Sequence, residues 1–248
     1  REALEDPELD VGEFGTLFDA LSATIQRLGE PLAGRCTMLA TFREDTEVPL
    51  SVLGRMWGTS NVETKKTIRK LKEWHLVDVD WDKCTLSLID LHLDYLRARA
   101  KNDLARWHAA LLRGCGRRRL GFDEDREDDS YWSNPIKVLH HLTGSGEELA
   151  KQGECEQVQE LCLQSSGVKA QQLTEVLPGF SGLKTLDLSA NQLGVAGASA
   201  IASVLKTMQI SSLECVAQPR TLPQWLLVEV RRHTPECSLS CQRPLTHA

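Results

Sequence analysis

The sequence predicts a multidomain protein, mainly α-helical with α/β parts, built from a winged helix-turn-helix, a small helical domain and a truncated leucine-rich-repeat solenoid. Three observations predict this architecture. Two helical patterns are followed by a hairpin pattern, which is the order of a winged helix. A second helical region contains runs of opposite charge that indicate exposed loops. The last third repeats a leucine motif at an interval typical of leucine-rich repeats.

Composition supports a soluble protein with more than one domain. The chain has 248 residues, of which 41% are hydrophobic and 26% charged, and its net charge is −6. This charge argues against a general nucleic-acid or acidic-membrane binder. No apolar run could span a bilayer, and the eight cysteines lack a CxxC pair. We therefore expect reduced thiols, a cytoplasmic location and no membrane partner. Because the chain begins at Arg1 without Met, we also expect it to be a fragment of a longer protein.

The winged helix is predicted over residues 14–103, after a linker at 1–13. A first helix is expected over Phe14–Leu28, where apolar residues recur at helical spacing. A short apolar stretch, Met38–Phe42, precedes a further helix with Pro49 in its first turn. The domain is therefore expected to begin with a helix, a short apolar stretch and a second helix.

A basic helix and a hairpin complete this domain. Ser60 and Glu63 have the spacing of a capping box, and the helix that they open puts Ile68, Leu71 and Trp74 on one side. Its other side, Lys65–Lys72, is basic. Two short alternating runs around the turn Trp81-Asp82-Lys83 then predict a β-hairpin.

A small helical domain is predicted over residues 104–157. Apolar residues return at helical spacing, and Trp107 and Trp132 occupy apolar positions that predict burial in a core. The arginine-rich stretch Gly114–Arg119 and the acidic stretch Asp123–Asp129 indicate exposed loops.

The repeats are predicted over residues 158–236. The pattern Val158-x-x-Leu161-x-Leu163-x-x-Ser166 recurs from Leu183 and again, degenerate, from Ile210, at offsets of 25 and 27 residues. A helix over Gly194–Lys206 separates the second and third copies. Residues 237–248 are a tail or the stub of a fourth repeat.

The strongest repeat suggests a protein-binding face. Leu186 and Leu188 should point into the core, together with Ile201 and Leu205 from the helix. Asn191 should turn inward and satisfy backbone groups at the end of the strand. The alternating side chains are then expected to be exposed and to bind a protein partner; these are Lys184, Thr185, Asp187 and Ser189.

Residues 14–156 resemble the arm that follows the nucleotide-binding domain in the apoptotic protease-activating-factor family, a group of STAND-class signalling NTPases. The matching motifs are Phe42-Arg43-Glu44-Asp45-Thr46-Glu47-Val48-Pro49, Val52-Leu53-x-x-Met56-Trp57, Leu91-His92-Leu93-Asp94-Tyr95-Leu96 and Asp129-Ser130-Tyr131-Trp132. The last third is similar to the ribonuclease-inhibitor type of leucine-rich repeat, and the combination resembles NOD-like receptors. The resemblance implies a winged helix that packs on a nucleotide-binding domain, an ADP- or ATP-dependent switch in the intact parent, and repeats that act as a sensor.

The chain departs from this family at the nucleotide site. No G-x-x-x-x-G-K-[ST] loop occurs, so we expect no cofactor in this chain and no enzyme activity. The family carries a His-Asp pair in the winged helix, where the His approaches the ADP phosphates. The matching positions here are Ile89 and Asp90. Asp90 is more simply interpreted as the N-cap of the next helix.

Two other functional interpretations were weighed. The Lys65–Lys72 helix could enter a DNA groove and make the chain a DNA-binding regulator, but a solvated helix face is favoured because the chain is acidic. His233, Cys237 and Cys241 have zinc-like spacing without an evident fourth ligand. His140 and His141 are expected to point apart on a helix and form no pair. We therefore predict no metal site, and assign the chain to regulation and protein recognition.

Overall fold

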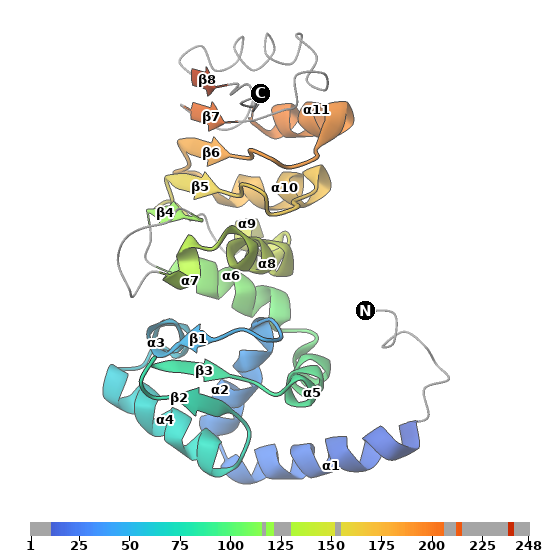
Figure 1. Ribbon diagram of the computed structural model, residues 1–248. Coiled ribbons are helices and arrows are strands. Elements are labelled where there is room, and N and C mark those ends of the chain that lie inside the picture. The colour runs from blue at the N-terminus through green and yellow to red at the C-terminus, as the bar shows by residue number, and fades with distance from the viewer. Residues whose placement is uncertain are drawn as a thin grey trace, which may run out of the picture. The chain divides into compact units, whose positions relative to one another are not determined.

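The computed structural model describes residues 11–115, 118–121, 130–151, 155–205, 212–214 and 238–240. The chain separates into two units, Arg1–Asn102 and Asp103–Ala248, and each is described by itself. The described residues are mainly helical, with small sheets (Figure 1). Within these ranges, no helix combines the length and the apolar character needed to cross a membrane.

Unit 1 combines helices with a small antiparallel sheet. The helices are α1 (Val11–Leu28), α2 (Leu32–Met38), α3 (Leu50–Trp57), α4 (Asn61–Glu73) and α5 (Asp90–Ala100), with a 3₁₀ turn η1 (Leu39–Thr41). The strands are β1 (Val48–Pro49), β2 (Asp78–Asp80) and β3 (Thr85–Ser87), in the order β1-β3-β2.

The helix starts in unit 1 follow local sequence signals. The Ser60 hydroxyl accepts a hydrogen bond from the Glu63 backbone N–H at 3.3 Å, so the predicted cap of α4 is confirmed. The Glu63 carboxylate pairs with Arg35. Pro49, expected inside the first turn of α3, instead precedes the helix in an extended conformation and belongs to β1.

The predicted hairpin is confirmed, and it carries a third strand that the sequence did not predict. Val79 of β2 lies opposite Leu86 of β3, and both side chains are buried. Val48 of β1 pairs with Leu86 on its other side and is also buried. A strand of two residues is too short to show an alternating pattern, which is why periodicity missed it.

Trp74 corrects the predicted apolar side of α4. Ile68 and Leu71 are fully buried as expected, but the Trp74 side chain is 42% exposed. It is the C-cap residue, with φ −91° and ψ 9°, so the helical periodicity no longer determines where its side chain points.

Unit 2 begins with helices and continues as alternating strands and helices. The helices are α6 (Leu104–Gly114), α7 (Ser130–Ser133), α8 (Pro135–Ser145), α9 (Glu148–Lys151), α10 (Ala170–Val176) and α11 (Gly194–Leu205), with a 3₁₀ turn η3 (Leu177–Gly179). The strands are β4 (Arg119–Leu120), β5 (Glu160–Cys162), β6 (Thr185–Asp187), β7 (Ser212–Glu214) and β8 (Ser238–Ser240).

The strands of unit 2 form one parallel sheet in chain order, β4-β5-β6-β7-β8 (Figure 1). The register aligns one leucine from each strand in a single row, and the described side chains of that row are fully buried; the row is Leu120, Leu161, Leu186, Leu213 and Leu239. Helices α10 and α11 pack against each other beside the sheet. Each strand therefore adds to a hydrophobic core that is shared with its neighbours.

The sheet extends beyond the residues predicted to form repeats. Gly114–Arg119 was expected to be an exposed loop, yet Arg119 begins β4 and pairs in register with Glu160. On the other side, Ser238–Ser240, in the predicted tail, pairs with β7. The acidic stretch Asp123–Asp129, which was also expected to be a loop, lies outside the described residues.

The helical part of unit 2 packs around α6 and α8. Asn134 caps α8, because its side-chain oxygen accepts the backbone N–H groups of Ile136 at 2.9 Å and Lys137 at 3.2 Å. The prediction that Trp132 is buried is confirmed, whereas Trp107 is only half-buried.

Replacing Leu188 by Ala should lower the free energy of unfolding of unit 2 by about 2–5 kcal/mol, because the side chain is only 2% exposed. The neighbouring exposed residue gives a matched control: Gln192→Ala should stay within about 0.5 kcal/mol of the wild type. Urea denaturation of the three proteins measures both values. Equal losses for the two variants would mean that the predicted core face is wrong.

Candidate functional site

The polar face of the unit 2 sheet was predicted to bind a partner, and two of its four proposed residues are accessible. Lys184 is exposed and Thr185 is half-buried. Thr185 lies in register with Glu160, which lies in register with Arg119. The Arg119 guanidinium donates to the Glu160 carboxylate at 2.8 Å. Arg119, Glu160 and Thr185 each lie one position before a leucine of the leucine row, so they form a polar row on the opposite side of the sheet. Lys184 directly precedes β6, and we call Arg119, Glu160, Lys184 and Thr185 the strand face.

Asp187 and Ser189 were expected on the same exposed surface, and this prediction is wrong. Their side chains are only 9% and 4% exposed. The Asp187 carboxylate accepts a hydrogen bond from the Ser189 backbone N–H at 2.8 Å and from the Cys162 thiol at 3.5 Å. Strand alternation does place Asp187 opposite the leucine side, but Cys162 lies directly beside it in register and helps to cover it. Asp187 therefore stabilises the turn after β6.

Asn191 turns inward as predicted. Its side-chain nitrogen donates to the backbone carbonyls of Leu163 at 2.7 Å and Leu188 at 3.0 Å, and its oxygen accepts the Gly167 N–H at 2.9 Å. Leu163 and Gly167 belong to the preceding strand–helix unit. One amide thus connects two consecutive units through backbone groups that the bends leave without strand partners. The predicted burial of Ile201 is also confirmed, and the side chain of Leu205 lies outside the described residues.

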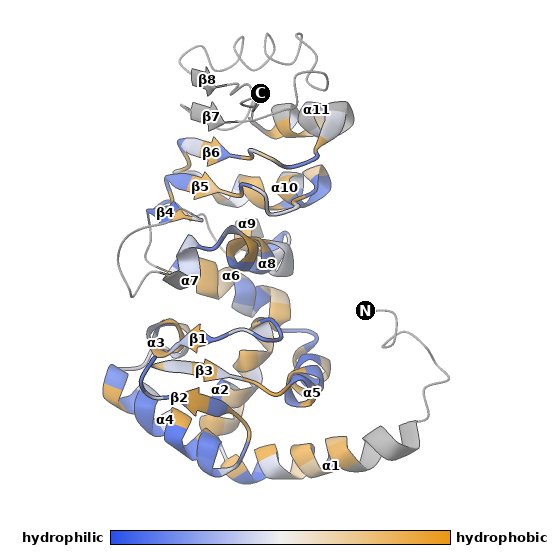
Figure 2. Cartoon of the chain, viewed as in Figure 1, coloured by the Kyte–Doolittle hydropathy of each residue, from blue (hydrophilic) through white to orange (hydrophobic). Residues whose placement is uncertain are grey.

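The basic helix α4 is predominantly hydrophilic (Figure 2), and its Lys66, Arg69 and Lys70 side chains are exposed. Arg69 lies over the ring of Trp81, with its guanidinium carbon 5.5 Å from the ring centroid. Lys72 donates to the Val79 carbonyl at 3.1 Å. Trp81 reaches Arg69 from the hairpin turn rather than from α4 itself, so the spacing of residues along the helix does not predict this contact.

Ile89 and Asp90, the degenerate nucleotide position, lie at the start of α5. Ile89 is the N-cap residue and is 55% exposed, and Asp90 is the first residue of the helix. The interpretation of Asp90 as a side-chain N-cap is therefore wrong by one position. Its carboxylate instead lies in the first turn, where a negative charge interacts favourably with the helix dipole.

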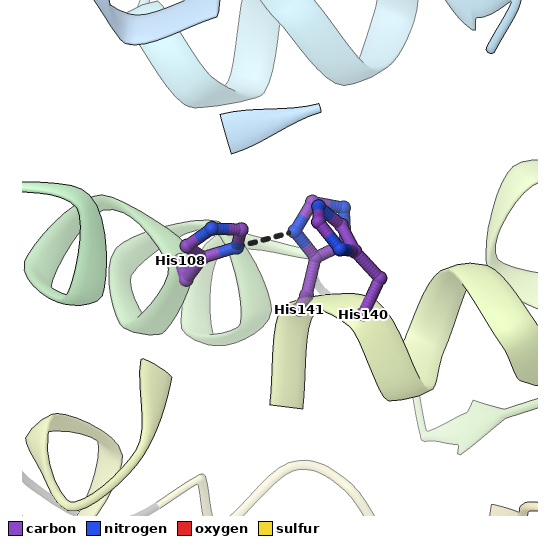
Figure 3. Close-up of side chains that lie close together, drawn as sticks. All are labelled: His108, His140 and His141. Carbon is purple, nitrogen blue, oxygen red and sulfur yellow. Dashed lines mark hydrogen bonds between the residues drawn. The ribbon is translucent and has the colours of Figure 1, made fainter. Parts of the chain in front are cut away.

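A cluster of three histidines joins α6 and α8 (Figure 3). His108 comes from α6, and His140 and His141 come from α8. The Nδ1 atoms of His108 and His141 lie 2.9 Å apart, within hydrogen-bond distance. The ring centroid of His140 lies 5.1 Å from that of His108 and 5.2 Å from that of His141. The prediction that His140 and His141 form no pair is wrong, since the two rings are in contact.

Tyr131 anchors this cluster from the other side. Its hydroxyl lies 2.7 Å from His141 Nε2, so both ring nitrogens of His141 have hydrogen-bond partners. His141 is completely buried. Burial lowers the pKa of His141 well below its ordinary value, and the neighbouring His108 and His140 lower it further. His141 is therefore a neutral imidazole, with one nitrogen that donates and one that accepts.

Gly144 allows the His108 ring to lie close to the backbone of α8. A Cβ atom at Gly144 would lie 2.5 Å from His108 Nε2, closer than such atoms approach. The Nε2 edge of His108 therefore packs against the backbone of α8, while Nδ1 faces His141. No sequence pattern connects His108 with the later pair, because the contact requires α6 and α8 to pack. The predicted zinc-like set of His233, Cys237 and Cys241 lies outside the described residues.

Comparisons with known protein families and with curated proteins find no match to this chain. The resemblance to STAND-class proteins therefore rests on the motifs quoted above, and the function is inferred from those motifs and from the geometry of the described residues.

Stability should fall as the pH is lowered below about 6.5, because a histidine in the unfolded chain binds a proton there while buried His141 does not. The lost stability lies in the window between the ordinary histidine pKa and the lowered pKa of His141. His141→Gln keeps a donor and an acceptor without titrating, so its free energy of unfolding should change less between pH 7.5 and 5.5. His75→Asn, at an exposed position in unit 1, is the control for replacing a histidine outside the cluster. An unchanged slope in His141→Gln would contradict the assignment.

Asp187→Ala should destabilise unit 2 by about 1–3 kcal/mol, because it leaves the buried Ser189 N–H without its acceptor. Asp187→Asn retains an acceptor oxygen and should cost less. Thermal melts of both variants test this. A loss below about 0.5 kcal/mol for Asp187→Ala would restore the original expectation of a surface recognition residue.

Proposed function

We propose that this chain is a regulatory and protein-interaction part of a STAND-class signalling protein of the NOD-like type. In this proposal unit 1 is the winged helix of the parent, and unit 2 contains a helical segment followed by a short leucine-rich-repeat solenoid. The observation that carries the proposal is the parallel sheet of unit 2, in which successive strands align one leucine each and Asn191 connects consecutive units.

The strand face is the proposed partner-binding surface. In a stack of strand–helix units, the leucine side is used for the core and the opposite side of the sheet is left for recognition. Lys184 and Thr185 supply an accessible amine and hydroxyl there, beside the Arg119–Glu160 ion pair. A mixed polar surface of this kind suits a protein partner with matching charges and hydrogen-bond groups. Asp187 and Ser189 are excluded from the surface by their burial.

Unit 1 is proposed to act in nucleotide-dependent autoinhibition of the parent. The order α3, α4 and hairpin β2-β3 supports a winged helix, and exposed Ile89 offers an apolar contact at the position where the family approaches its nucleotide. An isoleucine cannot donate a hydrogen bond to phosphate, so we expect the contact to be made with protein and the nucleotide to be held by the parent's own binding domain.

DNA binding through α4 is the second candidate function. Arg69 and Trp81 favour it, since a stacked guanidinium and an indole can both contact a nucleic acid. The acidic residues Asp78, Asp80 and Asp82 lie on the same hairpin as Trp81, and they would repel phosphates. The partner-binding role is therefore preferred.

Site-specific photocrosslinking tests the preferred function. A benzophenone amino acid at Thr185 of the full chain, expressed in cells of its source, should yield discrete adducts with a protein. The matched control places the same amino acid at exposed Gln171 on α10, away from the strands, where no such adduct is expected. Charge reversal by Lys184→Glu should weaken the Thr185 adducts.

Equal adducts at both positions, or adducts that ignore Lys184→Glu, would contradict a specific strand-face interaction. Fluorescence anisotropy distinguishes the second candidate. We expect any DNA binding to be lost at physiological salt. A tight, sequence-selective complex that survives this salt, and that Arg69→Ala abolishes, would assign the function to α4 instead.

A further inference from the structure

We propose that His108, His140 and His141 form a binding site for a divalent transition-metal ion, for which zinc is the best fit. The sequence predicted no metal here, because a His-His dipeptide on a helix is not a ligand pattern. Packing of α6 against α8 adds the third imidazole (Figure 3). This inference is independent of the strand face and of the STAND resemblance.

The geometry suits one ion shared by three imidazoles. One ring nitrogen from each histidine lies within 4.8 Å of the others. Three nitrogens bound to a tetrahedral zinc ion at ordinary bond lengths lie about 3.3 Å apart. The Nδ1 atoms of His108 and His141, at 2.9 Å, are already near this spacing. His140 is half-buried, and its ring would turn to bring its nitrogen to this spacing when the ion binds.

The tautomers fit ligation as well. If His141 Nε2 carries its hydrogen and donates to the Tyr131 hydroxyl, His141 Nδ1 presents a lone pair towards His108. In the metal-free protein a hydrogen on His108 Nδ1 fills the space between the two nitrogens. For His108 Nδ1 to bind a metal ion, this hydrogen would move to His108 Nε2, so that the imidazole stays neutral and its Nδ1 lone pair faces the ion. Tyr131 would then orient the ligand from behind, as partners of metal-bound histidines commonly do.

The residues packed around the three histidines keep the imidazoles neutral and restrict their positions. Metal ions bind the unprotonated imidazole, and burial among apolar groups keeps His141 in that form. Gly144 has no Cβ, so the Nε2 edge of the His108 ring can lie against the backbone of α8. Trp132 packs on His141, with 5.5 Å between the ring centroids. Lys137 lies beside Tyr131, with its Nζ 4.8 Å from the phenol ring centroid.

Three imidazoles select for a late first-row metal rather than for calcium or magnesium, which prefer oxygen ligands. The partly exposed position of His140 leaves the fourth coordination position to water. Such an ion would cross-link α6 to α8 and so stabilise the helical segment that leads into the repeat sheet. Its role would be structural, or it would couple the stability of unit 2 to metal supply.

Isothermal titration calorimetry with zinc chloride on the full chain under reducing conditions tests the proposal. We expect one ion per chain with micromolar or tighter affinity, and a melting temperature at least about 5 °C higher when free zinc is a hundredfold above Kd. Cobalt(II) replaces zinc as a spectroscopic probe. Its absorption should show bands of a nitrogen- and oxygen-ligated ion without the thiolate charge-transfer bands that cysteine ligation would give.

His140→Ala is the decisive variant, because His140 is the most exposed of the three residues and its loss leaves the His108–His141–Tyr131 hydrogen bonds in place. It should fold and lose at least about tenfold in zinc affinity. Tyr131→Phe keeps all three ligands and should weaken binding about 10- to 100-fold. His75→Asn is the control for surface histidines and should bind as the wild type does.

Two outcomes would overturn the proposal. If the wild-type chain shows neither heat of zinc binding nor a shift in melting temperature, the cluster is a hydrogen-bond network only. If zinc binds but His140→Ala leaves affinity and stoichiometry unchanged, the ion is held by other residues, and thiolate bands in the cobalt spectrum would identify cysteines among them.

Discussion

Unit 2 depends on the row of leucines that the parallel register brings together. Leu120, Leu161 and Leu186 are each fully buried, and none of their strands is longer than three residues. Strands this short cannot hold a sheet by their backbone hydrogen bonds alone, so each unit is stable only when its neighbours cover its leucine. Because the leucines of each strand are buried in this core, the alternate side chains lie on the opposite side of the sheet, where they can contact a partner.

Three polar side chains of unit 2, those of Asn191, Asp187 and His141, make hydrogen bonds to specific groups of the protein. Asn191 makes hydrogen bonds to backbone groups of two strand–helix units, and Asp187 accepts one from the turn after its own strand. His141 lies within hydrogen-bond distance of both His108 and Tyr131. A polar group that loses its partner in such a place costs more than a surface hydrogen bond contributes. These polar residues therefore contribute to the fold of unit 2 as its leucines do. Their role is structural, whereas the exposed polar residues of the strand face are available to a partner.

Local signals predicted a large part of the secondary structure. The Ser60 cap, the hairpin around Trp81 and the inward Asn191 all depend on interactions between residues close in sequence or on a repeated spacing, and each is confirmed. The candidate site was predicted less well. Lys184 and Thr185 are accessible, but Asp187 is not, because alternation gives the side of a strand and not the neighbour that covers it.

The sequence by itself determined where most helices and strands form, since spacing, capping and turn residues act within a few positions of the chain. Only the tertiary structure decided which polar groups are buried and which histidines meet. Two-residue strands β1 and β4 exist because partner strands lie beside them. His108 reaches His141 because Gly144 lets α6 approach α8 closely. Contacts of this kind join residues tens of positions apart, and a single sequence carries no local pattern for a distance that is set by packing.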